Sequence, residues 1–446
     1  MSNNIVIHRI NEIKGVNNMQ IHVVRPGDTL WRLSQAYNVS VNQLIQSNQI
    51  QNPTRLVVGQ TIVIPIVGSY HWVQPGESLY QISQQYNIPI SELIRINQIS
   101  NPNQISVGLR LYIPPKPRPT IDVAAYIDPN LTGTRSEAVV DEVADHLTFL
   151  NIFSYQINPD GTLSPPRIEQ PLINAAYRHR TAPLMVLTNF SEGQFSPELS
   201  TRILTDEALQ DKILDEAIKI MEQKGYLGLD FDFEYVGAAN RERYNQFLRK
   251  AAARLREKGY FISTALAPKT SADQVGTLYE GHDYQAHGAI VDFIFFMTYE
   301  WGWSGGPPMA VSPLPQVRKV LEYAISVVPR NKIMMGMPLY GYDWTLPYVP
   351  GGRFARAISP QQAIELALRY NARIEYDFVS QAPYFRYYDE QGRQHEVWFQ
   401  DARSVQAAFD LVKELGIRGV FYWALGYDFP QNWLLIQDNF VVRKRV

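Results

Sequence analysis

Three acidic residues at alternate positions are the best candidates in this sequence for acid–base chemistry. Asp230, Asp232 and Glu234 are separated by large apolar residues in the segment 228–235, GLDFDFEY. If this segment is a strand, its side chains alternate between two faces, so the three carboxyl groups share one face. Burial of three acids together disfavours their charged forms, and we expect at least one to be neutral at pH 7. The alternative is an acidic edge strand that faces water.

The elements around this segment predict a barrel that buries both faces of the strand. From residue 120 to 446, apolar runs alternate with amphipathic helical stretches, which is typical of parallel βα units. Eight runs are candidate strands: 121–126, 147–155, 184–187, 228–234, 261–267, 293–299, 333–339 and 419–423. We therefore predict the α/β class and a (β/α)8 TIM barrel, with the active site where the strands end. A helix at 361–370 and a hairpin of 385–388 with 396–399 predict a small α+β insertion at about 343–400.

An internal repeat precedes the barrel. The segments that begin at His22 and His71 match at a constant offset of 49 positions, and each has the pattern strand, helix, helix, strand. Polar residues stand where the first helix of each copy begins, and we expect Asp28 and Glu77 to contribute to capping it. A proline-rich stretch, 114–119, predicts a stiff spacer after the second copy.

Both repeats resemble LysM modules, which bind glycans that contain N-acetylglucosamine, such as peptidoglycan and chitin. The shared motifs are Gly27–Leu30 (GDTL), its counterpart Gly76–Leu79 (GESL), and an N-x-x-x-N-P motif in each copy. By this resemblance, the candidate glycan-binding residues are Gly27, Asp28, Thr29, Asn52, Gly76, Glu77, Ser78 and Asn101. The domains that we predict are a leader of unknown role at 1–18, modules at 20–66 and 69–115, and a catalytic domain at 120–446.

The acidic segment resembles the D-x-x-D-x-D-x-E signature of family-18 glycoside hydrolases. The first acid of that signature is replaced by Leu227. The resemblance implies that Glu234 is the catalytic acid, that Asp232 orients the acetamide of the substrate, and that Asp230 shares a proton or hydrogen bond with Asp232. It also implies that Tyr299 hydrogen-bonds the acetamide carbonyl and that Trp423 forms the floor of the sugar site. Further candidates to line the groove, at or near other strand ends, are Met297, Tyr126, Tyr155, Tyr340 and Tyr342.

The implied reaction is hydrolysis with retention, in which the acetamide of the substrate is the nucleophile. The segment 297–310, in which Glu300 follows Tyr299, and the two LysM-like repeats are similar to family-18 enzymes that degrade spore-cortex fragments during germination. The implied activity is that of an N-acetylglucosaminidase acting on cortex peptidoglycan. A chitinase and a non-catalytic lectin that binds chitin or peptidoglycan are the alternatives.

Composition limits the other classes of partner. The net charge is −2 without a basic run, which argues against nucleic acid. The sequence has no cysteine and no apolar run of about 18 residues, so we expect no disulfide and no membrane span. The first 18 residues lack the apolar region of a secretory signal, and we expect synthesis in the cytoplasm. The resemblance to cortex enzymes implies association with the spore, in its outer layers or cortex. We further expect a monomer without cofactor or metal, with His282 and His287 in a solvated loop.

Overall fold

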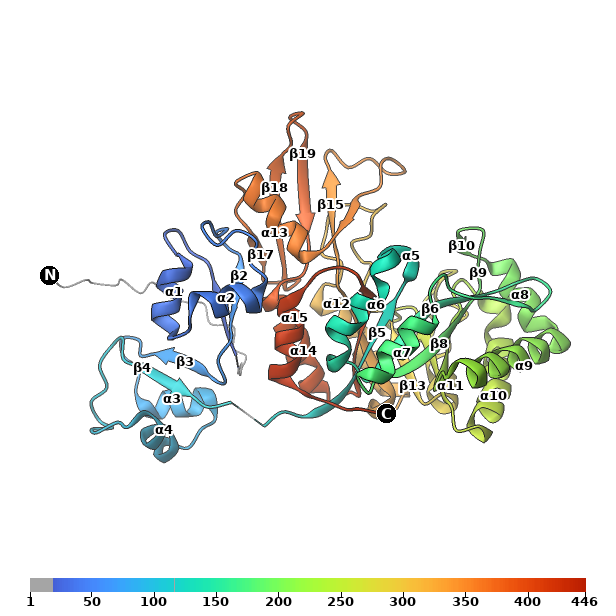
Figure 1. The fold of residues 1–446 in the computed structure, drawn as a ribbon, viewed down its shortest axis with the longest axis horizontal. Helices are drawn as coiled ribbons and strands as arrows, with labels where there is room; N and C mark the ends of the chain where they lie inside the picture. Colours follow the sequence, from blue (N-terminus) through green and yellow to red (C-terminus); the bar gives the residue numbers. More distant parts are fainter. Residues whose placement is uncertain (1–18, 116) are drawn as a thin grey trace.

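Eight parallel strands close into a barrel in the structure, a computed structural model that describes residues 19–115 and 117–446 (Figure 1). In chain order the strands are β5 (Thr120–Ile127), β6 (Phe149–Ile157), β8 (Ala182–Thr188), β11 (Gly228–Asp232), β12 (Phe261–Leu266), β13 (Phe293–Phe296), β14 (Ile333–Pro338) and β20 (Gly419–Leu425). Strand β5 pairs with both β20 and β6, which closes the cylinder. The predicted TIM barrel is confirmed, and the predicted leader at 1–18 lies outside the described residues.

Amphipathic helices cover the outside of the barrel. The longer ones are α6 (Ser136–Val143), α7 (Gln170–Arg178), α8 (Pro197–Thr205), α9 (Glu207–Lys224), α10 (Arg241–Glu257), α11 (Tyr284–Ile290), α12 (Leu314–Val327), α14 (Ala402–Leu415) and α15 (Pro430–Asn439). Helix α9 ends at Gly225, whose φ of +91° is in the left-handed region, and the chain then enters β11. No helix of the described ranges is long and apolar enough to cross a membrane.

The barrel has two apolar cores. One lies between the strands and the outer helices, and the other fills the lumen with rings such as those of Phe149, Phe293 and Phe421. Leu227, which stands at the first position of the acidic signature, packs against this lumen core. The lower lumen is thus apolar, and the acidic residues of β11 lie on top of it.

The insertion after β14 is a five-stranded antiparallel sheet with one helix, and it lies above the barrel in Figure 1. Its elements are β15 (Gly341–Thr345), β16 (Arg356–Ile358), α13 (Pro360–Arg369), β17 (Glu375–Asp377), β18 (Ala382–Tyr388) and β19 (Gln394–Trp398). The sequence pattern predicted α13 and the β18–β19 hairpin. It did not predict β15, β16 or β17, which have three to five residues each and carry little periodicity.

Each repeat has the predicted order of strand, helix, helix and strand. The first repeat consists of β1 (Gln20–Val23), α1 (Leu30–Tyr37), α2 (Val41–Asn48) and β2 (Thr61–Ile64), and the second of β3 (Ser69–Trp72), α3 (Leu79–Tyr86), α4 (Ile90–Asn97) and β4 (Arg110–Ile113). The prediction that Asp28 and Glu77 cap the first helix is wrong, because Thr29 and Ser78 are the N-cap residues.

Asp28 and Glu77 instead stabilise the turn that precedes the cap. The Asp28 carboxylate accepts a hydrogen bond from the Arg25 amide at 2.8 Å and lies 2.8 Å from Nε2 of His22. Glu77 makes the same pair of contacts with the Gln74 amide, at 2.7 Å, and with Nε2 of His71, at 2.8 Å. Because each of these carboxylates accepts a hydrogen bond within the turn, it does not cap the helix, and the residue that follows it does.

The first repeat is docked on the barrel through buried polar contacts with α15. The Gln431 side chain donates to the Thr61 carbonyl at 2.7 Å and to Oδ1 of Asn48 at 3.0 Å, and it accepts from the Thr61 hydroxyl at 3.0 Å. Val63 of β2 belongs to the outer core of the barrel. The second repeat contacts the first, where Arg110 donates to the Ala36 carbonyl at 2.8 Å.

We expect Gln431→Ala to weaken this docking. The substitution removes the buried side chain that donates to the Thr61 carbonyl and accepts from the Thr61 hydroxyl, at a cost of about 2 kcal/mol. The measurements are the thermal unfolding midpoint and the rate of proteolysis between the repeats and the barrel. Gln437→Ala, at an exposed position of the same helix, is the control. Equal midpoints and equal proteolysis rates for the two variants would show that Gln431 does not hold the first repeat.

Candidate active site

The three acidic residues lie at the carboxyl end of β11, and the predicted alternation of faces is present. Leu229, Phe231 and Phe233 point to the outer helices, where the Phe233 ring stacks on Tyr244 with centroids 5.5 Å apart. Asp230 and Asp232 lie on the opposite face, where they are 0% and 5% exposed. A solvated edge strand is therefore excluded, because β11 is paired on both sides, with β8 and β12.

Asp230 is fully buried and is satisfied by two hydroxyl donors. The Tyr126 hydroxyl donates to Oδ2 at 2.6 Å and the Ser263 hydroxyl donates to Oδ1 at 2.7 Å. Burial raises the pKa of Asp230 to about 6, although both hydrogen bonds favour the charged form. Both carboxylate oxygens of Asp230 thus have a hydroxyl donor, and the shared proton or hydrogen bond with Asp232 stays a prediction.

Asp232 is the acid whose charge is least favoured. Its Oδ1 is buried and has no hydrogen-bond partner in the described part of the chain. Burial, and then the charges of Glu234 and Asp230, raise the pKa of Asp232 well above its ordinary value. An unpartnered buried carboxylate is costly, so the charged form of Asp232 is strongly disfavoured in the free protein. Its Oδ1 is available to a polar group of a bound molecule.

Glu234 lies just beyond the end of β11 and is partly exposed at the mouth of the barrel. Its backbone is clamped by Asn189, which accepts from the Glu234 amide at 3.0 Å and donates to the Glu234 carbonyl at 2.8 Å. The next residue, Tyr235, has a φ of +55°. Burial, and then the charge of Glu300, raise the pKa of Glu234 to about 7. A carboxyl group with this pKa can donate and recover a proton near neutral pH.

Two buried histidines lie behind the acidic strand. His282 and His287 are both 0% exposed, so the prediction of a solvated loop is wrong. Nδ1 of His282 accepts from the Ala267 amide at 3.0 Å, and Nε2 donates to the Phe233 carbonyl at 2.9 Å, which fixes a neutral tautomer. Burial lowers the pKa of His282 to about 4. Across the described residues, no group of three or more histidines, aspartates and glutamates could hold a metal ion.

Aromatic side chains from other strand ends surround the acids. Tyr126, Met297, Tyr299 and Trp423 all pack at the lumen core, and the Trp423 and Tyr126 ring centroids are 5.7 Å apart. Tyr340 and Tyr342 lie near the rim, where both hydroxyls donate to Oε1 of Glu300. Burial raises the pKa of Glu300. The structure thus brings these six predicted residues to one end of the barrel.

Tyr155 does not face the lumen. Its hydroxyl donates to Glu169, which also accepts from Tyr226 at 3.0 Å, and its ring belongs to the outer core. The pairing of β6 with β8 shifts register between Ile152 and Tyr155. This irregularity breaks the alternation of side chains, so Tyr155 points outward although Phe153 packs at the lumen core.

A model of the glycosyl hydrolases family 18 matches residues 122–428, a range that starts within β5 and includes the other seven barrel strands and the insertion. The chain belongs to glycosyl hydrolase family 18. A LysM domain model also matches residues 22–65 and 71–114. The family-18 barrel and the two LysM repeats thus account for most of the chain.

Relatives with the same arrangement are similar over almost the whole chain. The cortical fragment-lytic enzyme of Bacillus subtilis (strain 168) is 55% identical over 96% of this chain and 99% of its own length. The enzyme of the same name from Bacillus anthracis is 48% identical over 96% and 100%. The crystal structure of the Bacillus megaterium QM B1551 spore cortex-lytic enzyme SleL has a TM-score of 0.88 and 44% identity, covering 96% of this chain and 100% of that chain.

The predicted glycan-binding residues of the LysM repeats lie in two turns of each copy. Gly27, Asp28 and Thr29 connect β1 to α1, and Asn52 follows α2. Gly76, Glu77, Ser78 and Asn101 have the same places in the second copy. Gly27, Thr29, Asn52 and their counterparts are exposed, whereas Asp28 and Glu77 are half-buried in the turn contacts described above.

Sequence reasoning missed several residues of the family-18 site. Asn189 follows β8, Ser263 lies within β12, and His282 precedes α11, and each of them hydrogen-bonds β11 or the residues that follow it. The sequence gives one usable signal for Asn189, which is a polar residue at the end of a predicted apolar strand. Glu300 served in the sequence analysis only to compare the chain with cortex-degrading enzymes, although its charge raises the pKa of Glu234.

The raised pKa of Glu234 predicts a pH-dependent gain in stability for Glu234→Gln. Because the folded-state pKa is about 7 and the ordinary value is 4.5, ionisation of Glu234 costs stability as the pH rises through this window. We expect the variant to be more stable than the parent by on the order of 2 kcal/mol at pH 8, with little gain at pH 4. The measurement is urea unfolding at both pH values.

Glu257→Gln, at an exposed position on α10, is the control for this comparison, and we expect no pH-dependent difference from it. A Glu234→Gln variant that gains no more stability at pH 8 than at pH 4 would contradict the raised pKa.

Proposed function

We propose that the chain is a peptidoglycan hydrolase that cleaves the glycosidic bond after N-acetylglucosamine in spore-cortex fragments, with retention of configuration. The observation that carries this proposal is the acidic set at the end of β11, in which Oδ1 of Asp232 is buried without a partner in the described residues and burial raises the pKa of Glu234 to about 7. The names of the relatives support cortex fragments as the substrate. The chain acts as a monomer, and it works in the outer layers of the spore.

The first step is protonation of the leaving group. Glu234 gives its proton to the glycosidic oxygen, and the bond from this oxygen to the anomeric carbon breaks. The acetamide oxygen of the same sugar attacks the anomeric carbon and forms an oxazolinium intermediate. The Asn189 clamp supports this role, because it fixes the backbone that carries Glu234. Water then attacks from the side that the leaving group left, and Glu234 takes its proton.

Asp232 and Tyr299 orient the acetamide. Oδ1 of Asp232, which has no partner in the described residues, accepts from the acetamide N–H, and the Tyr299 hydroxyl donates to the acetamide oxygen. Asp230 keeps its two hydroxyl donors and supports Asp232 from below. Trp423, which packs on Tyr126 and Phe153, forms the floor under the sugar ring, and Met297, Tyr340 and Tyr342 complete the wall.

The same geometry would serve a chitinase, since chitin also presents N-acetylglucosamine at the cut. Residues of the LysM repeats, among them Gly27, Thr29, Gly76 and Ser78, hold the glycan outside the barrel in either case. A lectin would not need an acid with a pKa of about 7, and the presence of Glu234 therefore favours an enzyme.

We expect Glu234→Gln to lower kcat on cortex fragments by about a thousandfold with little change in KM, because it removes the proton but keeps the shape of the side chain. Glu257→Gln is the control that should retain full activity. The new reducing ends should all be N-acetylglucosamine, since a muramic lactam has no free acetamide to act as nucleophile. Muramic reducing ends, or undiminished cleavage by Glu234→Gln, would contradict the proposal.

A further inference from the structure

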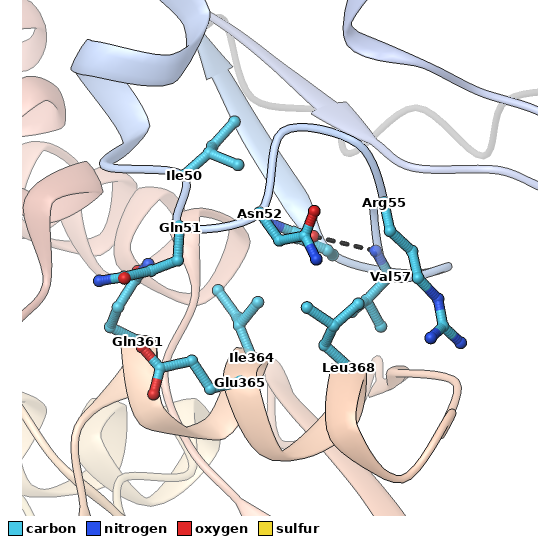
Figure 2. Close-up of a pocket in the computed structure, with 10 residues that line it drawn as sticks. Ile50, Gln51, Asn52, Arg55, Val57, Gln361, Ile364, Glu365 and Leu368 are labelled. Atoms are coloured by element: carbon cyan, nitrogen blue, oxygen red, sulfur yellow. Dashed lines mark hydrogen bonds between the residues drawn. The ribbon is translucent and has the colours of Figure 1, made fainter.

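A cluster of buried polar side chains lies beside the end of β11. It is formed by Tyr244, Lys269, His282 and His287. The junction between the first LysM repeat and α13 also encloses polar groups, but its space of about 20 Å³ admits one water-sized group, and its Gln361 serves to dock the repeat (Figure 2). The cluster beside β11, in contrast, contacts the segment that carries the acids.

Side chains hold the end of β11 where its backbone pairing stops. The pairing ends with Phe231 on the β12 side and with Asp232 on the β8 side. Glu234 therefore lies beyond the last paired residue of the strand. On the β8 side, Asn189 hydrogen-bonds both the amide and the carbonyl of Glu234. On the β12 side, the partner of the strand end is His282.

The His282 imidazole bridges β11 and β12 beyond their last backbone pair. Its Nε2 donates to the Phe233 carbonyl at 2.9 Å, and its Nδ1 accepts from the amide of Ala267, the residue that follows β12, at 3.0 Å. A carbonyl cannot donate and an amide N–H cannot accept, so only the neutral ring with its proton on Nε2 makes both bonds. The ring is fully buried, and water does not compete for either partner.

The other members of the cluster keep this ring in place and neutral. Nζ of Lys269, a fully buried side chain, donates to the His282 carbonyl at 2.9 Å. The rings of Tyr244 and His287 have centroids 6.5 Å from that of His282. Burial and the charge of Lys269 lower the pKa of His282, although the hydrogen bond to the Phe233 carbonyl favours the protonated form.

The same loop also contacts the chain on the other side of Glu234. At Gly281 a Cβ atom would lie 2.6 Å from Cβ of Val236 and 2.9 Å from the amide nitrogen of Gly237, so no side chain fits there. Gly281 and His282 thus contact the residues after and before the acid. These two contacts define the path of the backbone through Glu234.

We propose that His282 is a positioning residue for Glu234, and that its bridge between β11 and β12 holds the acid where it reaches the glycosidic oxygen. A general acid works only within hydrogen-bond reach of the atom that it protonates, and a displacement of about 1 Å can cost about a hundredfold in rate. The bridge also keeps water away from the carboxyl group. The proposal rests on the proposed function, in which Glu234 is the acid.

The test compares pH–rate profiles of full-length variants on cortex fragments. His282→Leu removes both hydrogen bonds, and we expect kcat to fall about thirtyfold with little change in KM. The alkaline midpoint of the profile should move down by about one pH unit, because water reaches Glu234 and lowers its pKa. The titratable groups that act on Glu234 or lie near it stay the same in every variant; they are Asp232, Tyr235, Tyr299 and Glu300.

His282→Gln is the rescue variant, because its amide keeps one donor and one acceptor. We expect it to restore most of kcat and the alkaline midpoint of the parent. His287→Leu is the matched control, since it removes a second buried histidine of the cluster, whose Nδ1 lies 3.2 Å from the Thr264 hydroxyl of β12. It should lower the thermal unfolding midpoint without moving the alkaline midpoint.

Gly281→Ala keeps the test decisive if His282→Leu folds poorly. It leaves His282 in place but displaces Val236, so we expect the alkaline midpoint to move in the same direction. An alkaline midpoint equal to that of the parent in the His282→Leu and Gly281→Ala variants that fold, or a His282→Gln variant no more active than His282→Leu, would overturn the positioning role. Failure of the proposed function has a separate sign, which is cleavage of cortex fragments by Glu234→Gln at the full rate.

Discussion

The cost of burying three carboxyl groups in one lumen is the constraint on which the site depends. Closure of the barrel excludes water from Asp230 and Asp232, and the protein satisfies only one of them with hydroxyl donors. Burial, and then the charges of Glu234 and Asp230, raise the pKa of Asp232 well above its ordinary value. Burial and the charge of Glu300 raise the pKa of Glu234. Asn189 hydrogen-bonds the backbone of Glu234 and His282 hydrogen-bonds that of Phe233, and these contacts hold the end of the strand in place.

The LysM repeats and the insertion form a structural unit with the barrel. Gln431 bonds the first repeat from one side and Gln361 bonds it from another, so its loops keep a fixed relation to the insertion. The second repeat contacts the first through Arg110, at a position where the first repeat has the buried Thr61. The divergence of the copies at this position therefore reflects different neighbours, not different folds.

Patterns that repeat along the chain made most of the fold predictable. The alternation of β11 predicted which side chains enter the lumen, and the constant offset predicted two βααβ copies. Tyr155 was not predictable, because a register shift reverses the alternation of β6 and leaves no mark in the sequence. Asn189 and His282 contact residues 45 and 49 positions away, and such pairs depend on which strands become neighbours. The N-caps were misassigned because two adjacent polar residues competed for one position.

The central claim is that the acids of β11 retain a proton at neutral pH. Infrared difference spectroscopy of the unliganded protein, titrated from acid to alkaline pH, measures this directly through the carbonyl band of protonated carboxyl groups. The account predicts a protonated-carboxyl band that persists at pH 7 in the parent chain and is weaker in Asp232→Asn, where only the contribution of Glu234 remains. A parent spectrum in which this band is already absent at pH 6 would mean that all three acids are charged, and would contradict the account.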